Sequence, residues 1–331
     1  MSRDIEFPRL VAIETTNRCN AKCKFCPNSS LARNRRLMSD ELFAKIIQDC
    51  KAFPLPAIEP FLQGEPFMDP KIIERLAYIN EQLPNTALRL YSNGAALTEA
   101  KSDQLRSLNV DKLYISLNTI NKERYEDIVG LPFERTMQNI RALASRSSKG
   151  PVAKKITLRL TLVNETTLEE VEAFKRLCCE LNVYPMTVGL FNYKGDIASD
   201  LPVPDYPCEH IDRLDIMSNG YTTLCCMDQE GEYGFGSIID KSVLEVFNNA
   251  KARRVRTMHR CGRRDKCEPC DRCNLFWPSF SCLTSLWKMR HMLSFARYYT
   301  KYSPNSLKLC NSVAIAQSAE VASDANFQQR I

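Results

Sequence analysis

The chain has 331 residues, of which 44% are hydrophobic and 25% charged, and its formal net charge is +6. These proportions exclude a wholly disordered chain, and so mild a positive charge is no argument for nucleic-acid binding. No apolar run approaches the roughly 18 residues that a membrane span needs, and the polar start of the chain is unlike a signal peptide. We therefore expect a cytoplasmic protein of about two domains.

Short apolar segments alternate with amphipathic segments from residue 9 to residue 195. The apolar segments predict six strands, at Leu10–Glu14, Ala57–Leu62, Leu88–Tyr91, Lys112–Leu117, Ile156–Val163 and Tyr184–Leu190. The segments between them predict helices, at 39–50, 70–83, 99–108, 133–146 and 168–181. This alternation predicts a parallel sheet covered by helices, either as a partial barrel or as an open doubly wound sheet.

Capping residues mark several of the predicted helix starts. Ser39 precedes the first helix and is a residue type that favours the N-cap position. Asp69 stands before Pro70, which suits the first turn of a helix because it has no N–H group. Thr167 followed by Glu170 predicts a capping box at the start of the last of these helices.

Fifteen of the residues are cysteine. Because thiols stay reduced in the cytoplasm, this number indicates metal or redox chemistry rather than a disulfide framework. One group lies near the start of the chain, at Cys19, Cys23 and Cys26. A second group lies in the last third, at Cys208, Cys225, Cys226, Cys261, Cys267, Cys270 and Cys273. The scattered ones are interpreted as ordinary thiols, at Cys50, Cys178, Cys179, Cys282 and Cys310.

The first group places three thiols within eight residues, directly after the first predicted strand. Three thiolates can hold three irons of an iron–sulfur cube and leave the fourth iron open to another ligand. A zinc site would need a fourth cysteine or histidine nearby, and residues 1–49 contain none. The spacing therefore favours an open 4Fe–4S cluster over a zinc site.

The spacing of Cys19, Cys23 and Cys26, with Phe25 before the last cysteine, resembles the radical S-adenosylmethionine (SAM) superfamily. In that family the open iron binds the amino and carboxylate groups of SAM. Weaker family motifs follow at the ends of successive predicted strands, the end where parallel α/β folds build their sites. The resemblance implies a set of SAM-contacting residues at Gly64, Glu65, Ser92, Asn93, Ser116, Asn118 and Arg159.

Two of these motifs depart from the family pattern. Gln63 stands where the family has the first glycine of a Gly-Gly-Glu-Pro segment, and Asn118 stands where it usually has aspartate. The resemblance covers residues 9–195 and implies a partial (β/α)6 TIM-like barrel. It divides the chain into a radical SAM core at 1–195, a small iron–sulfur domain at 196–282 and a C-terminal tail at 283–331.

The second cysteine group resembles the C-terminal SPASM extension of radical SAM enzymes, in the reduced form called a twitch domain. Such a domain carries one auxiliary 4Fe–4S cluster held by four thiolates. The resemblance implies Cys208, Cys225, Cys270 and Cys273 as ligands, with Cys267 as an alternative. A structural zinc ribbon would use the same pairs of cysteines.

The remaining features of this segment have plain interpretations. His210 and His259 lie near the cysteines in sequence and are interpreted as bystanders. Six arginines between Arg253 and Arg264 are interpreted as a solvated helix face, with a basic surround for an anionic cluster as the alternative.

The resemblance implies that a reduced cluster cleaves SAM and that a hydrogen atom is taken from a C–H bond of the substrate. An auxiliary cluster that accepts an electron would give net oxidation, whereas a cysteine that returns a hydrogen atom would give epimerisation. Cys226 and Cys261 are the candidate donors for the second route. Flavodoxin or ferredoxin is the implied electron donor.

Three functions compete at this point. The leading hypothesis is oxidation or epimerisation of a small polar molecule such as a sugar or aminocyclitol, because the chain resembles inosamine dehydrogenases and sugar epimerases of this group. A peptide-modifying enzyme is second, since such enzymes commonly carry a peptide-binding domain before the barrel and this cluster motif begins at residue 19. A non-catalytic, zinc-stapled binding protein is third.

Overall fold

The computed structural model describes residues 5–145, 150–163, 165–199, 201–275, 277–278, 289–290 and 292–297. Most of the predicted 283–331 tail, together with Cys282 and Cys310, lies outside the described residues. Within the described part, no helix has the length and apolar character needed to cross a membrane.

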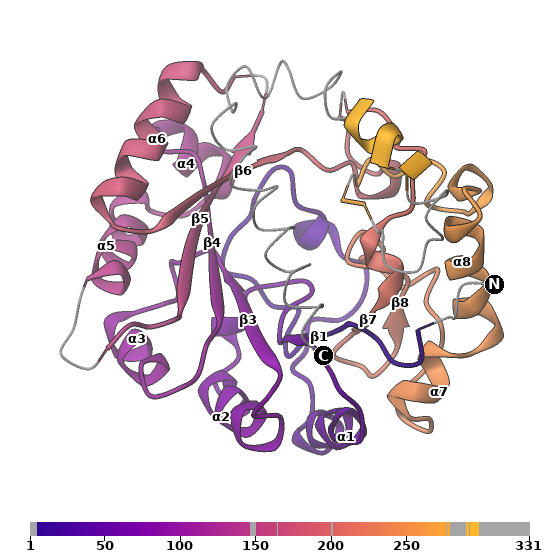
Figure 1. Cartoon of the computed structure of the whole chain (residues 1–331). Coiled ribbons are helices and arrows are strands. Elements are labelled where there is room, and N and C mark those ends of the chain that lie inside the picture. Colours follow the sequence, from indigo (N-terminus) through magenta and orange to yellow (C-terminus); the bar gives the residue numbers. More distant parts are fainter. Residues whose placement is uncertain are drawn as a thin grey trace.

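The six predicted strands form one curved parallel sheet (Figure 1). They are β1 (Leu10–Ile13), β2 (Ala57–Glu59), β3 (Ala87–Ser92), β4 (Lys112–Asn118), β5 (Lys155–Leu162) and β6 (Tyr184–Gly189). The order across the sheet is β6-β5-β4-β3-β2-β1-β7-β8. The sheet is thus an open, partial barrel, as the family resemblance implies.

Helices cover the outer face of this sheet (Figure 1). They are α1 (Asp40–Lys51), α2 (Ile72–Gln82), α3 (Glu99–Leu105), α4 (Lys122–Val129), α5 (Phe133–Ala144) and α6 (Leu168–Glu180). The core lies between the two layers, where Ile46 of α1 packs with Val11 and Ile13 of β1 in one fully buried cluster. Each strand therefore turns alternate side chains toward the helices and the others toward the inside of the barrel.

The helix starts agree only in part with the predicted caps. Ser39 does accept from Leu42 N, but α2 begins at Ile72 rather than at residue 70, because Asp69 bonds Lys71 N in a turn before the helix. Thr167 caps α6. The predicted capping box is nevertheless incomplete, since the carboxylate of Glu170 is bonded elsewhere. Helix α4 was not predicted at all.

A second part of the chain continues the same sheet. Strand β7 (Arg213–Ile216) pairs in parallel with β1, and β8 (Thr222–Thr223) pairs antiparallel with β7. Helices α7 (Val243–Phe247) and α8 (Ala250–Arg260) follow. The predicted 196–282 domain thus shares a sheet with the barrel, and its boundary at residue 195 remains a prediction.

Candidate active site

Three partly exposed cysteine side chains lie on the loop that follows β1. Burial raises the pKa of the Cys19 thiol to about 11 and that of Cys23 to about 12, and neighbouring thiols add to both shifts. Burial also raises the pKa of Cys26. Three thiolates this close repel one another, so the deprotonated set needs a cation to stabilise it. A 4Fe–4S cluster held by three cysteines fits this donor set.

Helix α4 supports this cysteine loop. Lys22 N donates to Val129 O over 3.0 Å, and Lys24 N donates to Ile128 O over 2.9 Å. Both acceptors lie at the C-terminal end of α4, where carbonyl groups have no partner within the helix. The sequence pattern predicts neither α4 nor this support of the cysteine loop.

The predicted site residues that follow β2 and β3 come together beside the cysteine loop. Glu65 Oε2 accepts from Asn93 N over 2.7 Å, and Glu65 Oε1 accepts from Ser92 Oγ over 2.9 Å. Asn93 Nδ2 lies 4.0 Å from Cys19 Sγ. Burial raises the pKa of Glu65 to about 7. Gly64, at a φ of 87°, lets this segment approach the start of the cysteine loop.

The predicted residues on β4 and β5 lie farther along the same edge. Ser116 and Arg159 are register partners, and Asn118 adopts a left-handed φ of 66° that asparagine tolerates. The Arg159 guanidinium lies 5.7 Å from the centre of the Tyr91 ring. Its buried Nε finds no hydrogen-bond partner in the described part of the chain. Arg159 alternates with core leucines along β5, so its side chain faces the inside of the barrel.

The four implied auxiliary ligands also gather in space. Cys208 and Cys273 belong to one buried cluster against which Cys225 packs. Cys270 interacts electrostatically with Cys225 and Cys208. Burial raises the pKa of Cys208 to about 12, and burial with the nearby thiols raises that of Cys225 further. These four thiols fit a second 4Fe–4S cluster, as the first set does.

The fifth cysteine of this region faces a histidine. Side-chain hydrogen bonds with Cys270 and His259 lower the pKa of Cys267. His259 is fully buried, and its Nδ1 accepts from Cys208 N over 3.3 Å. This ring therefore joins two segments that carry cysteines of the implied auxiliary set, a structural role that the interpretation of His259 as a bystander does not include.

The arginine run is not a solvated face throughout. Arg264 is only 2% exposed, and its guanidinium donates to four backbone carbonyl groups around the auxiliary cysteines. Two of these carbonyls belong to Cys270 and Cys273, at 3.3 Å and 2.8 Å. Arg256 is also buried, against the Phe247 ring. Helical periodicity could not reveal this, since Arg264 follows the end of α8.

The two candidate hydrogen donors have different surroundings. Cys226 Sγ lies 3.4 Å from His210 Nδ1, a contact that the interpretation of His210 as a bystander does not include. Gln63 Nε2 donates to Cys226 O over 3.0 Å, which gives the departure from the family motif a structural role. Cys261 is exposed at the C-terminal end of α8. Only Cys226 of the two adjoins the auxiliary cysteines.

Charged side chains line the barrel near Cys226. Arg213 of β7 forms ion pairs with Asp215, at 2.5 Å, and with Glu59 of β2, at 3.2 Å. Asp215 also lies with His210 and Cys226 in a group whose polar atoms are within 4.8 Å of one another. The interior beside the auxiliary cysteines is therefore polar, a feature that strand patterning did not predict.

A buried ion pair joins the cysteine loop to the auxiliary half. Both Arg33 guanidinium nitrogens NH1 and NH2 donate to the Glu14 carboxylate, at 2.6 Å and 2.5 Å. Ser218 Oγ donates to the same carboxylate over 2.7 Å, and Arg33 Nε donates to Gln229 O over 2.8 Å. Residues on both sides of Cys225 are thus held against the loop that carries Cys19.

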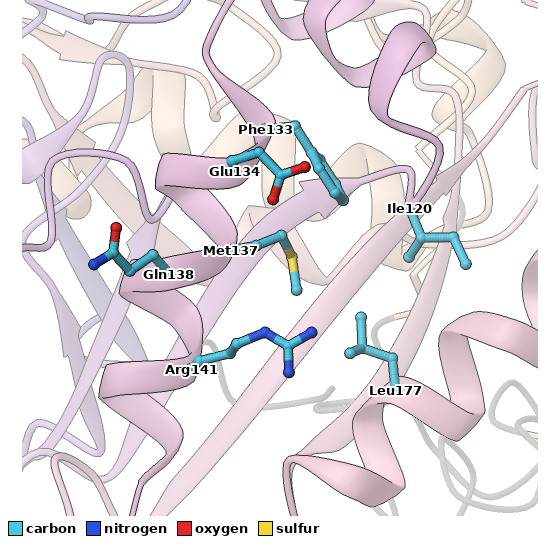
Figure 2. Close-up of a pocket in the computed structure, with 7 residues that line it drawn as sticks. All are labelled: Ile120, Phe133, Glu134, Met137, Gln138, Arg141 and Leu177. Carbon is cyan, nitrogen blue, oxygen red and sulfur yellow. The ribbon is translucent and has the colours of Figure 1, made fainter.

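A cavity of about 570 Å³ lies apart from these sites, between α5 and α6. Figure 2 shows Met137 and Arg141 extending from α5 toward Leu177 of α6, with Ile120 nearby. None of the predicted site residues lines it.

A curved parallel sheet with an open three-cysteine loop and a second four-cysteine set defines a radical SAM enzyme with an auxiliary cluster. The family model of the radical SAM superfamily matches residues 13–178, and the chain belongs to this superfamily. The model of the SPASM iron–sulfur cluster-binding domain matches residues 208–274. These matches support SAM and 4Fe–4S clusters as the cofactors.

Several curated proteins resemble this chain. An AdoMet-dependent heme synthase of Methanosarcina barkeri is 29% identical over 60% of this chain and 56% of its own length. A probable GTP 3′,8-cyclase of Methanosarcina mazei is 27% identical over 50% of this chain and 49% of its own length. The chain thus matches about half the length of these relatives. An S-adenosyl-L-methionine-dependent 2-deoxy-scyllo-inosamine dehydrogenase of Niallia circulans is 20% identical over 80% of this chain and 92% of that protein.

Solved structures share the fold. BtrN in complex with AdoMet and 2-DOIA has a TM-score of 0.61 and 18% identity, over 85% of this chain and 98% of BtrN. SuiB of Streptococcus suis, bound to its precursor peptide SuiA, has a TM-score of 0.65 and 16% identity, over 82% of this chain and 70% of SuiB. The likeness supports the partial barrel with a small auxiliary domain.

Proposed function

We propose that the protein is a radical SAM oxidoreductase that dehydrogenates or epimerises a small polar molecule, such as a sugar or an aminocyclitol. The observation that carries this proposal is the polar barrel interior beside the auxiliary cysteines, with its buried Arg213 and Asp215 pair. Paired charges of this kind suit hydroxyl and amino groups better than apolar side chains. The similarity to the inosamine dehydrogenase supports the same class.

The bound clusters and SAM would supply the hydrogen abstraction, which is the cofactors' own chemistry. Cys19, Cys23 and Cys26 would hold the first cluster, with Glu65 and Arg159 directed to SAM. Cys208, Cys225, Cys270 and Cys273 would hold the second cluster, with Cys267 as the alternative ligand. Flavodoxin or ferredoxin remains the proposed electron donor.

In this proposal, the thiol of Cys226 decides between dehydrogenation and epimerisation. This thiol lies 3.4 Å from His210 and beside the auxiliary cysteines. If the thiol gives a hydrogen atom to the substrate radical, epimerisation results, and an electron from the reductant with a proton from the solvent would restore the thiol. If the thiol only lines the site, the substrate radical would lose a proton and pass an electron to the auxiliary cluster, which gives dehydrogenation.

Product mass separates these reactions. We would incubate the reconstituted protein, SAM and dithionite without oxygen in deuterated water, with 2-deoxy-scyllo-inosamine, myo-inositol or glucosamine as substrate. Dehydrogenation removes two hydrogens from the product. Epimerisation preserves the mass except for one deuterium taken from the solvent, and Cys226→Ala abolishes it. The three-cysteine variant Cys19/Cys23/Cys26→Ala is the control without turnover.

The alternative function is modification of a peptide. If none of the three compounds raises 5′-deoxyadenosine formation above the substrate-free level, the small-molecule proposal fails.

A further inference from the structure

The side chain of Tyr193 lies between the two cysteine sets. Its ring packs against the buried cluster that contains Cys208 and Cys273. Its phenol also interacts electrostatically with Cys26 of the first set, with Cys226 and with Arg159. Tyr193 is therefore near the thiols of both cluster sites, and a substrate that reacts between the clusters would have to pass close to this ring.

The backbone at Tyr193 is strained. Tyr193 and Lys194 have φ values of 44° and 58°, in the left-handed region that residues other than glycine rarely adopt. This conformation is unfavourable for residues other than glycine, so the surrounding structure must hold it in place. Glycine and asparagine adopt this conformation more readily than tyrosine and lysine do. Backbone strain of this kind is concentrated at functional sites.

The strained turn is held by the auxiliary loop. Arg272 Nε donates to Lys194 O over 3.0 Å. Asn192 and Asn274 bond reciprocally, each through its own N–H to the side-chain oxygen of the other, at 2.9 Å and 3.1 Å. Arg272 and Asn274 stand on either side of Cys273, an implied ligand. The position of the Tyr193 ring is thus set by the same loop that carries the auxiliary cysteines.

The hydroxyl group of Tyr193 has no hydrogen-bond partner among the residues that the structure describes. The side chain is only half-buried. A phenol used only for packing would bond a neighbouring protein group. Tyr125 does so in the same barrel, because its hydroxyl bonds Thr136 over 3.0 Å.

We propose that Tyr193 contacts the substrate and hydrogen-bonds one of its alcohol hydroxyl groups between the two cluster sites. This inference rests on the proposed function. A phenol both donates and accepts, as an alcohol does. Arg159 is the neighbouring group that would take an anion, so the two side chains differ in the groups they recognise.

Tyr193→Phe tests this contact, because it removes the hydroxyl and keeps the ring. With whichever of 2-deoxy-scyllo-inosamine, myo-inositol and glucosamine turns over fastest, we expect KM to rise about tenfold, the effect of one lost hydrogen bond. Iron content and substrate-free SAM cleavage should stay at the wild-type level. Tyr221→Phe removes a phenol that is exposed on the auxiliary half, and it should leave KM unchanged.

Deoxy analogues of the chosen compound identify the partner group. The analogue that lacks the contacted hydroxyl should have equal KM values for the wild type and Tyr193→Phe. If the wild type and Tyr193→Phe have equal KM values for the full compound, this inference is overturned and the proposed function stands. A loss of iron in Tyr193→Phe has the same consequence. Wild-type protein that turns over none of the compounds would overturn the proposed function, and this inference with it.

Discussion

At the scale of single residues, Gly64 decides how closely two segments of the SAM site approach. A Cβ at this position would lie 2.7 Å from Arg18 O and 2.8 Å from Thr16 O, which are backbone atoms that cannot move aside. We expect Gly64→Ala to lower the melting temperature and the iron bound by the first cluster site. Gly236→Ala is the matched control, since Gly236 also has a positive φ but has no neighbour within 4 Å. Equal losses in both variants would show that backbone strain alone matters.

Glu65 predicts a pH dependence of SAM binding. Burial raises its pKa to about 7, so the carboxyl is mostly protonated below that pH. An amino group donates more strongly to a carboxylate than to a carboxylic acid. SAM affinity should therefore fall as the pH is lowered from about 8 to about 6. At the lower pH Glu65 must lose its proton before it can bind the SAM amino group as a carboxylate, and this loss costs free energy. Equilibrium dialysis measures this dependence.

In Glu65→Gln we expect affinity about tenfold weaker at pH 8, as the loss of a charge-assisted bond implies, and a flatter pH profile. A profile as steep as that of the wild type would show that another group, such as the amino group of SAM, titrates instead.

At the scale of elements, the short loop after α8 depends on one buried arginine. Arg264 bonds four carbonyl groups, and its removal would leave these buried acceptors unsatisfied. We expect Arg264→Met to lose the auxiliary cluster while the first cluster remains, so that iron falls from about eight to about four per chain. Arg263→Met changes the exposed neighbour and should keep all the iron. Full iron content in Arg264→Met would refute this role.

At the scale of the whole molecule, the Arg33–Glu14 pair ties the cysteine loop to the auxiliary half. The Glu14 side chain is fully buried, so Arg33→Met would leave an uncompensated charge. We expect the free energy of unfolding to fall by about 3 kcal/mol or more. Adding Glu14→Gln to Arg33→Met should recover part of this loss. Urea unfolding of the wild type, the two single variants and the double variant gives the coupling energy. Additive effects would mean that the pair contributes nothing as a unit.

Iron analysis tests the two-cluster organisation. After anaerobic reconstitution the wild type should contain about eight irons, and the Cys19/Cys23/Cys26→Ala variant about four. A different result would be about four irons in the wild type and none in the variant, with one zinc in both. The auxiliary half would then be a structural zinc domain and could not accept an electron.

Much of this architecture could be predicted from local patterns. All six strands of the barrel lie within a few residues of their predicted positions, because alternation of apolar segments is a local property. Helix α4 was missed because it is short and mostly charged. The capping box at Thr167 was incomplete because Glu170 turns to Thr119 and Arg124, partners that lie far away in sequence.

The chemistry predicted for the cysteine sets and the order of the SAM motifs follow from local sequence, because ligand type and spacing are properties of nearby residues. Local sequence does not predict that Gln63 reaches Cys226, that Arg264 is buried or that β7 extends the barrel sheet. The same holds for the place of Tyr193 between the two cysteine sets. Each of these depends on segments that the folded chain brings together from distant positions, and local periodicity carries no information about such approaches.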